Sequence, residues 1–342
     1  MKKGRNLRSV NTDGGVNLQF KLLSAIGIII IVSGHCYHGG MELAYNWFPP
    51  YSYNLALFVF ISGYFYKTDY EENIGKYIWK RTKRLLIPAY LWNIFYGGMV
   101  AFLGLFGFTI GAKPDLYNLF VMPFVDGEAF QYNLGSWFVY PLFLVCIINV
   151  LFRKFLKLIH LDNEFIVLIV YLAIGMIGIN TAIGNPTAIN GIVKLLVRTM
   201  FFLPCYEFGR FYKAVLEKKD TLNNVAYFAI IFAVQLILLT FCKDLEYTPS
   251  SFTKFNNGFI IPYISSITAI AFWLRVSRLL VPAIGNSKLV RLIADNTYGI
   301  MVNQLVGFMC LKFVFYGLSR ITSGSLFGDF NVASFKSNIW YY

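Results

Sequence analysis

The chain has little charge and few histidines. Only 14% of its 342 residues are Asp, Glu, Lys or Arg, against about 25% in soluble globular domains, and three are His. Its hydrophobic share is 57% and its aromatic share 18%. This composition excludes a soluble enzyme, a disordered tail protein and a disulfide-stapled secreted module. It indicates a protein that crosses a membrane several times.

Cysteine pairs are also missing. The five Cys are scattered singly, so we interpret them as small apolar side chains. His35, Cys36 and His38 lie close together, but the sequence adds no fourth ligand or carboxylate cluster, and we predict no metal site. The net charge is +13, yet the basic residues fall in short bursts between apolar runs. We therefore expect no nucleic-acid partner.

What the chain does contain is a series of long apolar runs. A hydrocarbon core about 30 Å thick needs about 20 residues of apolar helix to cross it. We therefore expect an all-α, polytopic membrane protein with about nine or ten transmembrane helices. The third span is long enough to be tilted or broken around Gly97–Gly98. The nine spans that we mark lie near residues 19–37, 52–66, 85–111, 134–152, 164–183, 191–209, 223–242, 257–274 and 296–318.

Basic residues are shared unequally between the connections on the two sides. With the N-terminus inside, the inside segments hold 21 Lys and Arg, and the outside segments hold five. The positive-inside rule therefore predicts a cytoplasmic N-terminus. We divide the chain into a cytoplasmic segment (1–17), a transmembrane domain (18–320) and a C-terminal tail (321–342), after which a tenth helix would follow.

His35 stands at the outer end of the first span. An ionisable residue there is costly and is a candidate functional residue. An imidazole titrates near neutral pH and can take a proton from a hydroxyl. The alternative is an interfacial histidine that bonds loop backbone. On an ideal helix Lys21 and Ser24 share the face of His35, so Lys21 places a cation at the inner end of that face.

Three arginines are further candidates. Arg81 and Arg84 are three residues apart, so they project from one helix face and can grip phosphates; anchoring by the positive-inside rule is the alternative. Arg198 lies inside the sixth span with nothing in that span to neutralise it. Further along the same span, Glu207 and Arg210 have the spacing of an ion pair within one helix.

Two uncharged residues complete the set. Asn303 is a polar amide in the last span, where it either bonds a neighbouring helix or lines a polar cavity. Trp137, at the start of the fourth span, is either part of an interfacial aromatic belt or a platform on which a sugar stacks.

Taken in order, these segments resemble acyltransferase family 3, which includes O-acetyltransferases of bacterial surface polysaccharides. Two family positions differ here: Ser24 stands where the family has a basic residue, and Asn303 and Gln304 stand where a histidine is common. The motifs that carry the resemblance are Ser24 to His35, Leu57 to Phe65 with its Ser62-Gly63 pair, Lys80 to Tyr90, Gly135 to Pro141, the Phe-Phe-Leu-Pro stretch ending in Gly209, and Asn296 to Met301.

The resemblance implies an integral O-acyltransferase of the cell membrane. It would move an acyl group, in the first instance acetyl, from acyl-CoA to a hydroxyl of a cell-surface polysaccharide or lipid-linked glycan. The departures leave two other classes open, a transporter or flippase for a polysaccharide intermediate and an inactive scaffold. The implied site residues are His35 for catalysis, Arg81, Arg84, Lys21 and Arg198 for acyl-CoA, and Trp137 and Asn303 for the acceptor.

Overall fold

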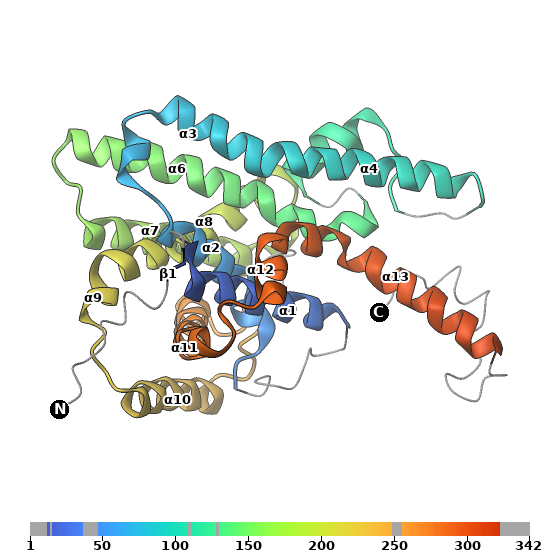
Figure 1. The fold of residues 1–342 in the computed structure, drawn as a ribbon. Helices are drawn as coiled ribbons and strands as arrows, with labels where there is room; N and C mark the ends of the chain where they lie inside the picture. The colour runs from blue at the N-terminus through green and yellow to red at the C-terminus, as the bar shows by residue number, and fades with distance from the viewer. Residues whose placement is uncertain are drawn as a thin grey trace.

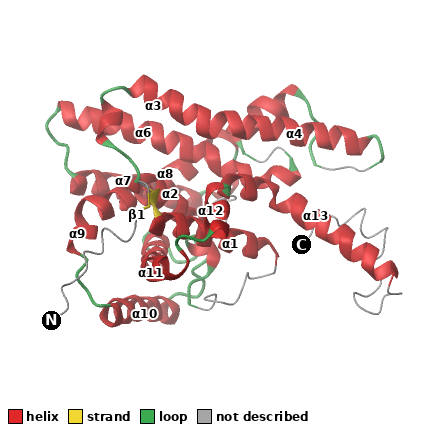
Figure 2. Ribbon diagram, in the orientation of Figure 1, coloured by secondary structure: helices red, strands yellow, loops and turns green. Residues whose placement is uncertain are grey.

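The computed structural model describes residues 12–13, 16–36, 47–107, 111–127, 130–247 and 255–321. Helices make up nearly all of this part, which confirms the all-α class (Figures 1 and 2). The strands described are β1 (Thr12–Asp13) and β2 (Val16–Asn17), which pair antiparallel. The predicted tail lies outside the described residues, apart from Ile321.

The helices follow one another through the chain with short connections. They are α1 (Leu18–Cys36), α2 (Asn54–Tyr64), α3 (Ile74–Arg81), α4 (Ile87–Gly104), α5 (Met122–Val125), α6 (Val139–Leu158), α7 (Glu164–Gly184), α8 (Gly191–Phe211), α9 (Glu217–Lys219), α10 (Asn224–Phe241), α11 (Ile261–Ile284), α12 (Lys288–Asp295) and α13 (Thr297–Ile321). Short 3₁₀ turns include Pro50–Ser52, Thr68–Glu71 and Gln131–Phe138.

Each of the nine predicted spans contains a helix. Within the described residues, six helices are long and apolar enough to cross a membrane: those that contain α1, α3 with α4, α6, α7, α10 and α11. Two of the other three fall short for physical reasons: α2 has only 11 residues, and α8 carries four charged residues. In α13 the run Thr297–Leu311 is apolar.

The third predicted span is longer than expected and is not broken where we expected. α3 and α4 form one helix from Ile74 to Gly104, joined by a π-helical stretch, Thr82–Leu86. Pro88 cannot donate a backbone hydrogen bond to the preceding turn, and the wider π turn lies directly before it. The irregularity is therefore at residues 82–86, and α4 is continuous through Gly97 and Gly98.

α8 is the centre of the bundle. It packs against α2, α6 and α7, and three of its four charged residues, Arg198, Glu207 and Arg210, are buried. α2 crosses it at two glycines: a Cβ on Gly63 would collide with the carbonyl of Tyr206, and one on Gly209 with the carbonyl of Phe60. Two glycines from separate sequence motifs thus allow two backbones to touch.

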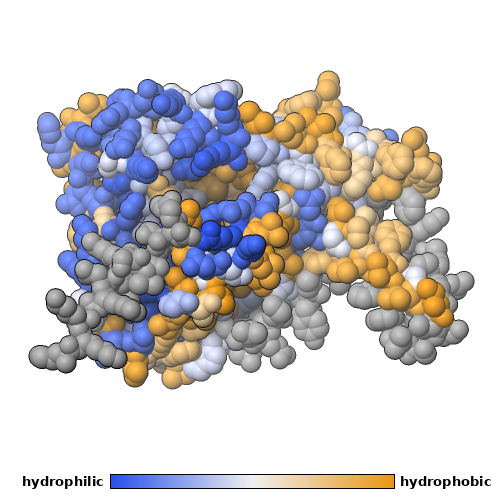
Figure 3. Space-filling model, viewed as in Figure 1, coloured by the Kyte–Doolittle hydropathy of each residue, from blue (hydrophilic) through white to orange (hydrophobic). Residues whose placement is uncertain are grey.

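The bundle has two chemically different ends. Figure 3 shows hydrophilic residues gathered where α3 begins and α6 ends, and hydrophobic residues over α4 and α13. We call the first the basic end, because Lys76, Lys80, Lys154 and Lys157 lie in α3 and at the end of α6. The opposite end is where α1 finishes and α8 starts. α1 runs antiparallel to α2, since Phe20 stacks on Tyr64.

Candidate functional site

His35 lies in the last turn of α1, half-buried at the opposite end of the bundle. Its ring meets the ring of Tyr51 edge to face, with centroids 6.3 Å apart. The Tyr51 hydroxyl donates to the carbonyl of Gly34 at 2.9 Å, one residue before the histidine. Tyr51 therefore contacts the end of α1 through both its ring and its hydroxyl, and it orients the helical turn that carries the imidazole.

Tyr51 is in turn held from the other side. It lies in the 3₁₀ turn before α2, and its carbonyl accepts a hydrogen bond from the backbone of Tyr247 at 3.3 Å. Burial, with a smaller contribution from Glu246, raises the pKa of the Tyr51 hydroxyl, so it stays protonated and able to donate. Tyr247 packs on Phe201 of α8, with ring centroids 5.1 Å apart. This series of contacts joins His35 to the core helix.

Arg198 and Trp137 meet in the same half of the bundle, near the start of α8. The Arg198 guanidinium lies 4.4 Å from the centre of the Trp137 ring, and it donates to the carbonyl of Asp126 at 2.6 Å. Both side chains are buried, with exposed fractions of 1% and 7%. Phe202 lies parallel to the tryptophan at 6.3 Å. A sugar would stack on Trp137 only after one of these neighbours had moved.

Arg81 is the last residue of α3, the helix that begins at the basic end, and Arg84 lies in the π-helical stretch that follows it and packs against α6. The Arg81 Nε donates to the Tyr77 hydroxyl at 3.0 Å, and its guanidinium stands over the same ring. The Arg84 side chain is exposed and has no hydrogen bond or ion pair to any residue that the structure describes. Of the two, Arg81 is held in place and Arg84 is open to a ligand.

Lys21 is also at the basic end, where it forms an ion pair with Asp295 at the end of α12. Ser24 donates its hydroxyl to the carbonyl of Phe20 in its own helix. The predicted cation on the face of His35 is thus present but paired. A phosphate at Lys21 would have to compete with the Asp295 carboxylate.

Asn303 connects two helices. Its amide nitrogen donates to the carbonyl of Gly299 in α13, and its oxygen accepts from the Tyr96 hydroxyl of α4 at 2.9 Å. Next to it, the oxygen of Gln304 is buried and has no partner among the described residues. Of the two readings of Asn303, the contact between helices is the one in place.

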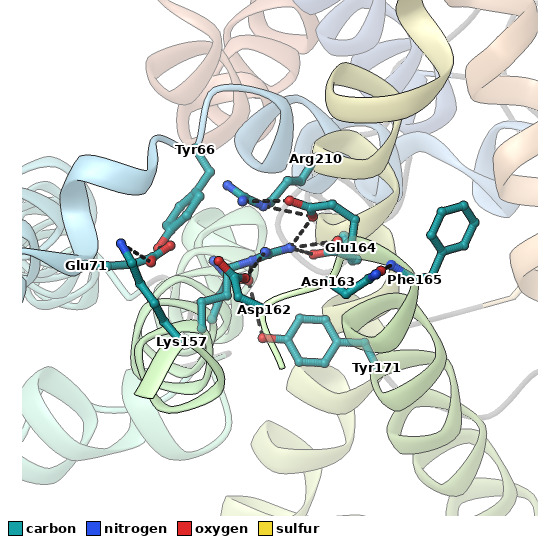
Figure 4. A network of polar contacts seen from close by, with 12 residues as sticks. Tyr66, Glu71, Lys157, Asp162, Asn163, Glu164, Phe165, Tyr171 and Arg210 are labelled. Atoms are coloured by element: carbon teal, nitrogen blue, oxygen red, sulfur yellow. Dashed lines mark hydrogen bonds and ion pairs between the residues drawn. The ribbon is translucent and has the colours of Figure 1, made fainter. Parts of the chain in front are cut away.

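A cluster of charged residues at the basic end is centred on Arg153. The positive-inside count includes Arg153 only as one of the basic residues of the inside segments, but its exposed fraction is 0%. One guanidinium nitrogen lies 2.7 Å from Glu164 and 2.7 Å from Glu207, and the other lies 3.6 Å from Asp162. The cluster connects α6, α7 and α8 (Figure 4).

The expected ion pair between Glu207 and Arg210 is wrong. Arg210 instead binds Glu164 of α7 with both Nε and a terminal nitrogen, at 3.1 and 2.8 Å, and Glu207 binds Arg153. The signal in the sequence was the spacing of Asn149 and Arg153. They are four residues apart, on a face of α6 that is otherwise apolar.

Metal ligands do not gather in the described part of the chain. No group of three or more His, Cys, Asp or Glu side chains is close enough there to hold an ion. His38 lies outside the described residues.

One comparison with known proteins gives a match. A family model described as an acyltransferase domain matches residues 17–330, a range that contains every helix from α1 to α13. Neither the curated proteins nor the solved structures contain a chain with a significant match.

Proposed function

Since this chain belongs to acyltransferase family 3 and is a multi-pass membrane acyltransferase, we propose that it transfers an acetyl group from acetyl-CoA to a hydroxyl of a cell-surface polysaccharide or its lipid-linked precursor. The observation that carries the proposal is the family match over residues 17–330. The excess of basic residues at one end supports a protein in the cell membrane with a cytoplasmic N-terminus. Acyl-CoA then approaches from the basic end.

His35 is the proposed catalytic residue. A neutral imidazole accepts the proton of the acceptor hydroxyl, the hydroxyl oxygen attacks the thioester carbonyl, and the CoA thiolate leaves. The alternative is that His35 attacks first and carries the acyl group until the acceptor takes it. The Tyr51 contacts support either role, since they hold the end of α1 in one orientation.

Arg84 and Arg81 are the proposed contacts of the CoA phosphates. The exposed Arg84 suits a phosphate, because a guanidinium binds phosphate oxygens in pairs. Arg81 is oriented by Tyr77 one turn earlier. Lys21 is a further candidate at the same end if Asp295 releases it. The donor then has to extend through the bundle, because α1 alone separates Lys21 from His35 by about 21 Å.

The remaining candidate residues are Arg198, Trp137 and Asn303. Arg198 and Trp137 lie in the half of the bundle that contains His35, so we now assign the pair to the acceptor side rather than to CoA. Asn303 reaches the acceptor only if its bond to Tyr96 opens.

The first experiment uses membrane vesicles that contain the full chain, with labelled acetyl-CoA supplied at the cytoplasmic face. Label entering glycan or lipid-linked glycan is compared between the wild type and His35→Ala at matched expression. The control is His160→Asn, since His160 is exposed and has a positive φ of 56° that asparagine tolerates.

We expect transfer by the wild type and by His160→Asn and none by His35→Ala. If a folded His35→Ala variant still transfers the label, the protein is an acyltransferase but His35 is not its catalytic residue. With a competent acceptor present, no transfer by any of the three proteins would favour the transporter or the scaffold.

A further inference from the structure

An apolar pocket lies on the flank of the bundle, away from His35. Its volume is about 450 Å³, within the range of about 300–1,000 Å³ that is usual for ligand pockets. The wall on one side is Leu168 of α7, the wall on the other is Tyr227 of α10, and the floor includes Phe60, Phe208 and Ile270 of α2, α8 and α11. α10 packs mainly against α11, so the space between α10 and α7 stays open.

The pocket opens toward hydrocarbon. α7, α10 and α11 are three of the six helices that are long and apolar enough to cross a membrane. Two apolar residues at the opening, Leu216 and Ile267, are 46% and 39% exposed. In water such an apolar surface would be costly, but between membrane helices it faces lipid. A hydrocarbon chain is the occupant whose surface matches these walls.

One end of the pocket is polar and carries an excess of positive charge. Asp220 lines this end and uses both carboxylate oxygens, one on Arg275 at 2.6 Å and one on Arg278 at 2.8 Å. Arg278 also donates to the hydroxyl of Tyr212. The exposed Lys219 lines the same end and has no ion pair among the residues that the structure describes. Glu217, which accepts a hydrogen bond from Tyr64, adds a second carboxylate near Arg278. Three cations thus face two carboxylates, and the remaining positive charge favours an anionic headgroup.

This pocket is separate from the proposed catalytic residue. Tyr212, at its polar end, packs against Tyr64 at the C-terminal end of α2, whereas Tyr51 and His35 lie before the N-terminal end of α2. The two places are therefore about 16 Å apart along an 11-residue helix. No residue of α1 lines the pocket.

We infer that the groove between α7 and α10 binds one acyl chain of an anionic glycerophospholipid, with the phosphate beside Lys219 at the basic end of the bundle. The lipid fills the space that the side-chain packing of α10 leaves open. The inference does not depend on the proposed acetyl transfer.

The test uses the purified full chain, reconstituted in vesicles with phosphatidylglycerol that carries a photoreactive diazirine in one acyl chain. Cross-linked peptides are mapped after illumination. We expect label on the segments that hold Tyr227 and Ile267, and a yield at least threefold lower when the diazirine is in phosphatidylcholine. Label spread over all lipid-facing helices with no preference would overturn the site.

Two pairs of variants separate the tail from the headgroup. Ala271→Trp fills the pocket, and we expect it to lower the yield at least fivefold; Ile230→Trp, on the exposed side of α10, leaves the yield unchanged. Lys219→Ala removes most of the preference for phosphatidylglycerol, whereas the neighbouring exposed Lys218→Ala keeps it.

A second variant that fills the pocket, Ile267→Trp, keeps the test valid if Ala271→Trp does not fold. Ile267 is already partly exposed, so a larger side chain there disturbs the packing less. Full labelling in a folded Ile267→Trp and Ala271→Trp would overturn the proposal. Competition gives a further test, in which unlabelled compounds are added before illumination. If a long-chain acyl-CoA or a polyprenyl phosphate abolishes the label and unlabelled phosphatidylglycerol does not, the pocket belongs to the donor or the acceptor, and the proposal is overturned.

Discussion

The guanidinium of Arg153 and the carboxylate of Glu207, 54 positions apart in the chain, meet at 2.7 Å with no exposure of either side chain. The pair joins α6 to the central helix α8. Glu164 adds α7 to the same cluster, and through Arg210 it binds α8 a second time. Three helices whose apolar faces could slide past one another are thus fixed in register by a few charged groups.

The first prediction concerns this pair. Arg153→Met leaves the buried Glu207 carboxylate without its partner, and breaking a buried ion pair in this way costs about 3–5 kcal/mol. We expect a large fall in the melting temperature of the detergent-solubilised protein. Lys154→Met, at the next and exposed position, is the control and leaves it unchanged. The double variant Arg153→Met with Glu207→Leu recovers most of the loss; no recovery would mean that Glu164 and Asp162 depend on Arg153 more than Glu207 does.

The second prediction concerns the crossing of α2 and α8. Gly63→Ala places a methyl group against the carbonyl of Tyr206, so the helices must separate, and we expect a loss of about 1–3 kcal/mol or more. Gly75→Ala in α3 is the matched control, because its Cβ would meet nothing within 4 Å. There we expect a gain of about 0.4–1 kcal/mol. Shifts of the melting temperature in opposite directions for the two variants support the close crossing of α2 and α8, and equal shifts contradict it.

The third prediction tests the support of His35. Tyr51→Phe removes the hydrogen bond to the carbonyl of Gly34, which is worth about 0.5–1.5 kcal/mol, and loosens the turn that carries the imidazole. We expect kcat to fall severalfold while the KM for acetyl-CoA stays the same. Tyr90→Phe in α4 also removes a hydroxyl that donates to a backbone carbonyl, that of Phe120, and keeps kcat. Equal kcat values in the two variants would mean that Tyr51 does not position His35 for the reaction.

The fourth prediction separates the arginines. Arg84→Gln is expected to raise the KM for acetyl-CoA about tenfold, equivalent to about 1.4 kcal/mol of binding. Lys83→Gln, an exposed neighbour whose ammonium lies over Trp79, changes it little. Arg198→Gln lowers the melting temperature through the lost contact with Trp137, worth about 0.5–2 kcal/mol, without changing this KM. A tenfold rise for Arg198→Gln would return it to the CoA site.

The helices were predictable because a membrane span is a local property of the chain. About 20 apolar residues are enough to define one, and all nine predicted spans contain a helix. The details at their ends were not predictable in the same way. The basic run from Lys80 to Arg84 was expected to lead into a span, whereas it lies inside one helix that begins at Ile74 and passes through a π turn.

The candidate residues show the same difference between what one segment of the sequence indicates and what depends on packing between segments. His35 stood out because an ionisable side chain is rare in an apolar run, and the structure adds Tyr51, whose contact depends on the fold of the following loop. For Trp137 the sequence left two interpretations open, an interfacial aromatic belt and a platform for a sugar. Its burial under Arg198 depends on the approach of the 3₁₀ segment Gln131–Phe138 to α8, and no spacing within either segment indicates it.

The sequence by itself determined that the protein is helical, that it crosses a membrane, and which acyltransferase family it resembles, because these depend on composition and on motifs within single segments. Only the tertiary structure decided which charges neutralise one another. Arg153 finds Glu164 and Glu207, and Lys21 finds Asp295 at a separation of 274 positions. A buried charge must be paired, but the partner is fixed by which helices pack together, and the packing is set by close approaches such as that at Gly63 and Gly209.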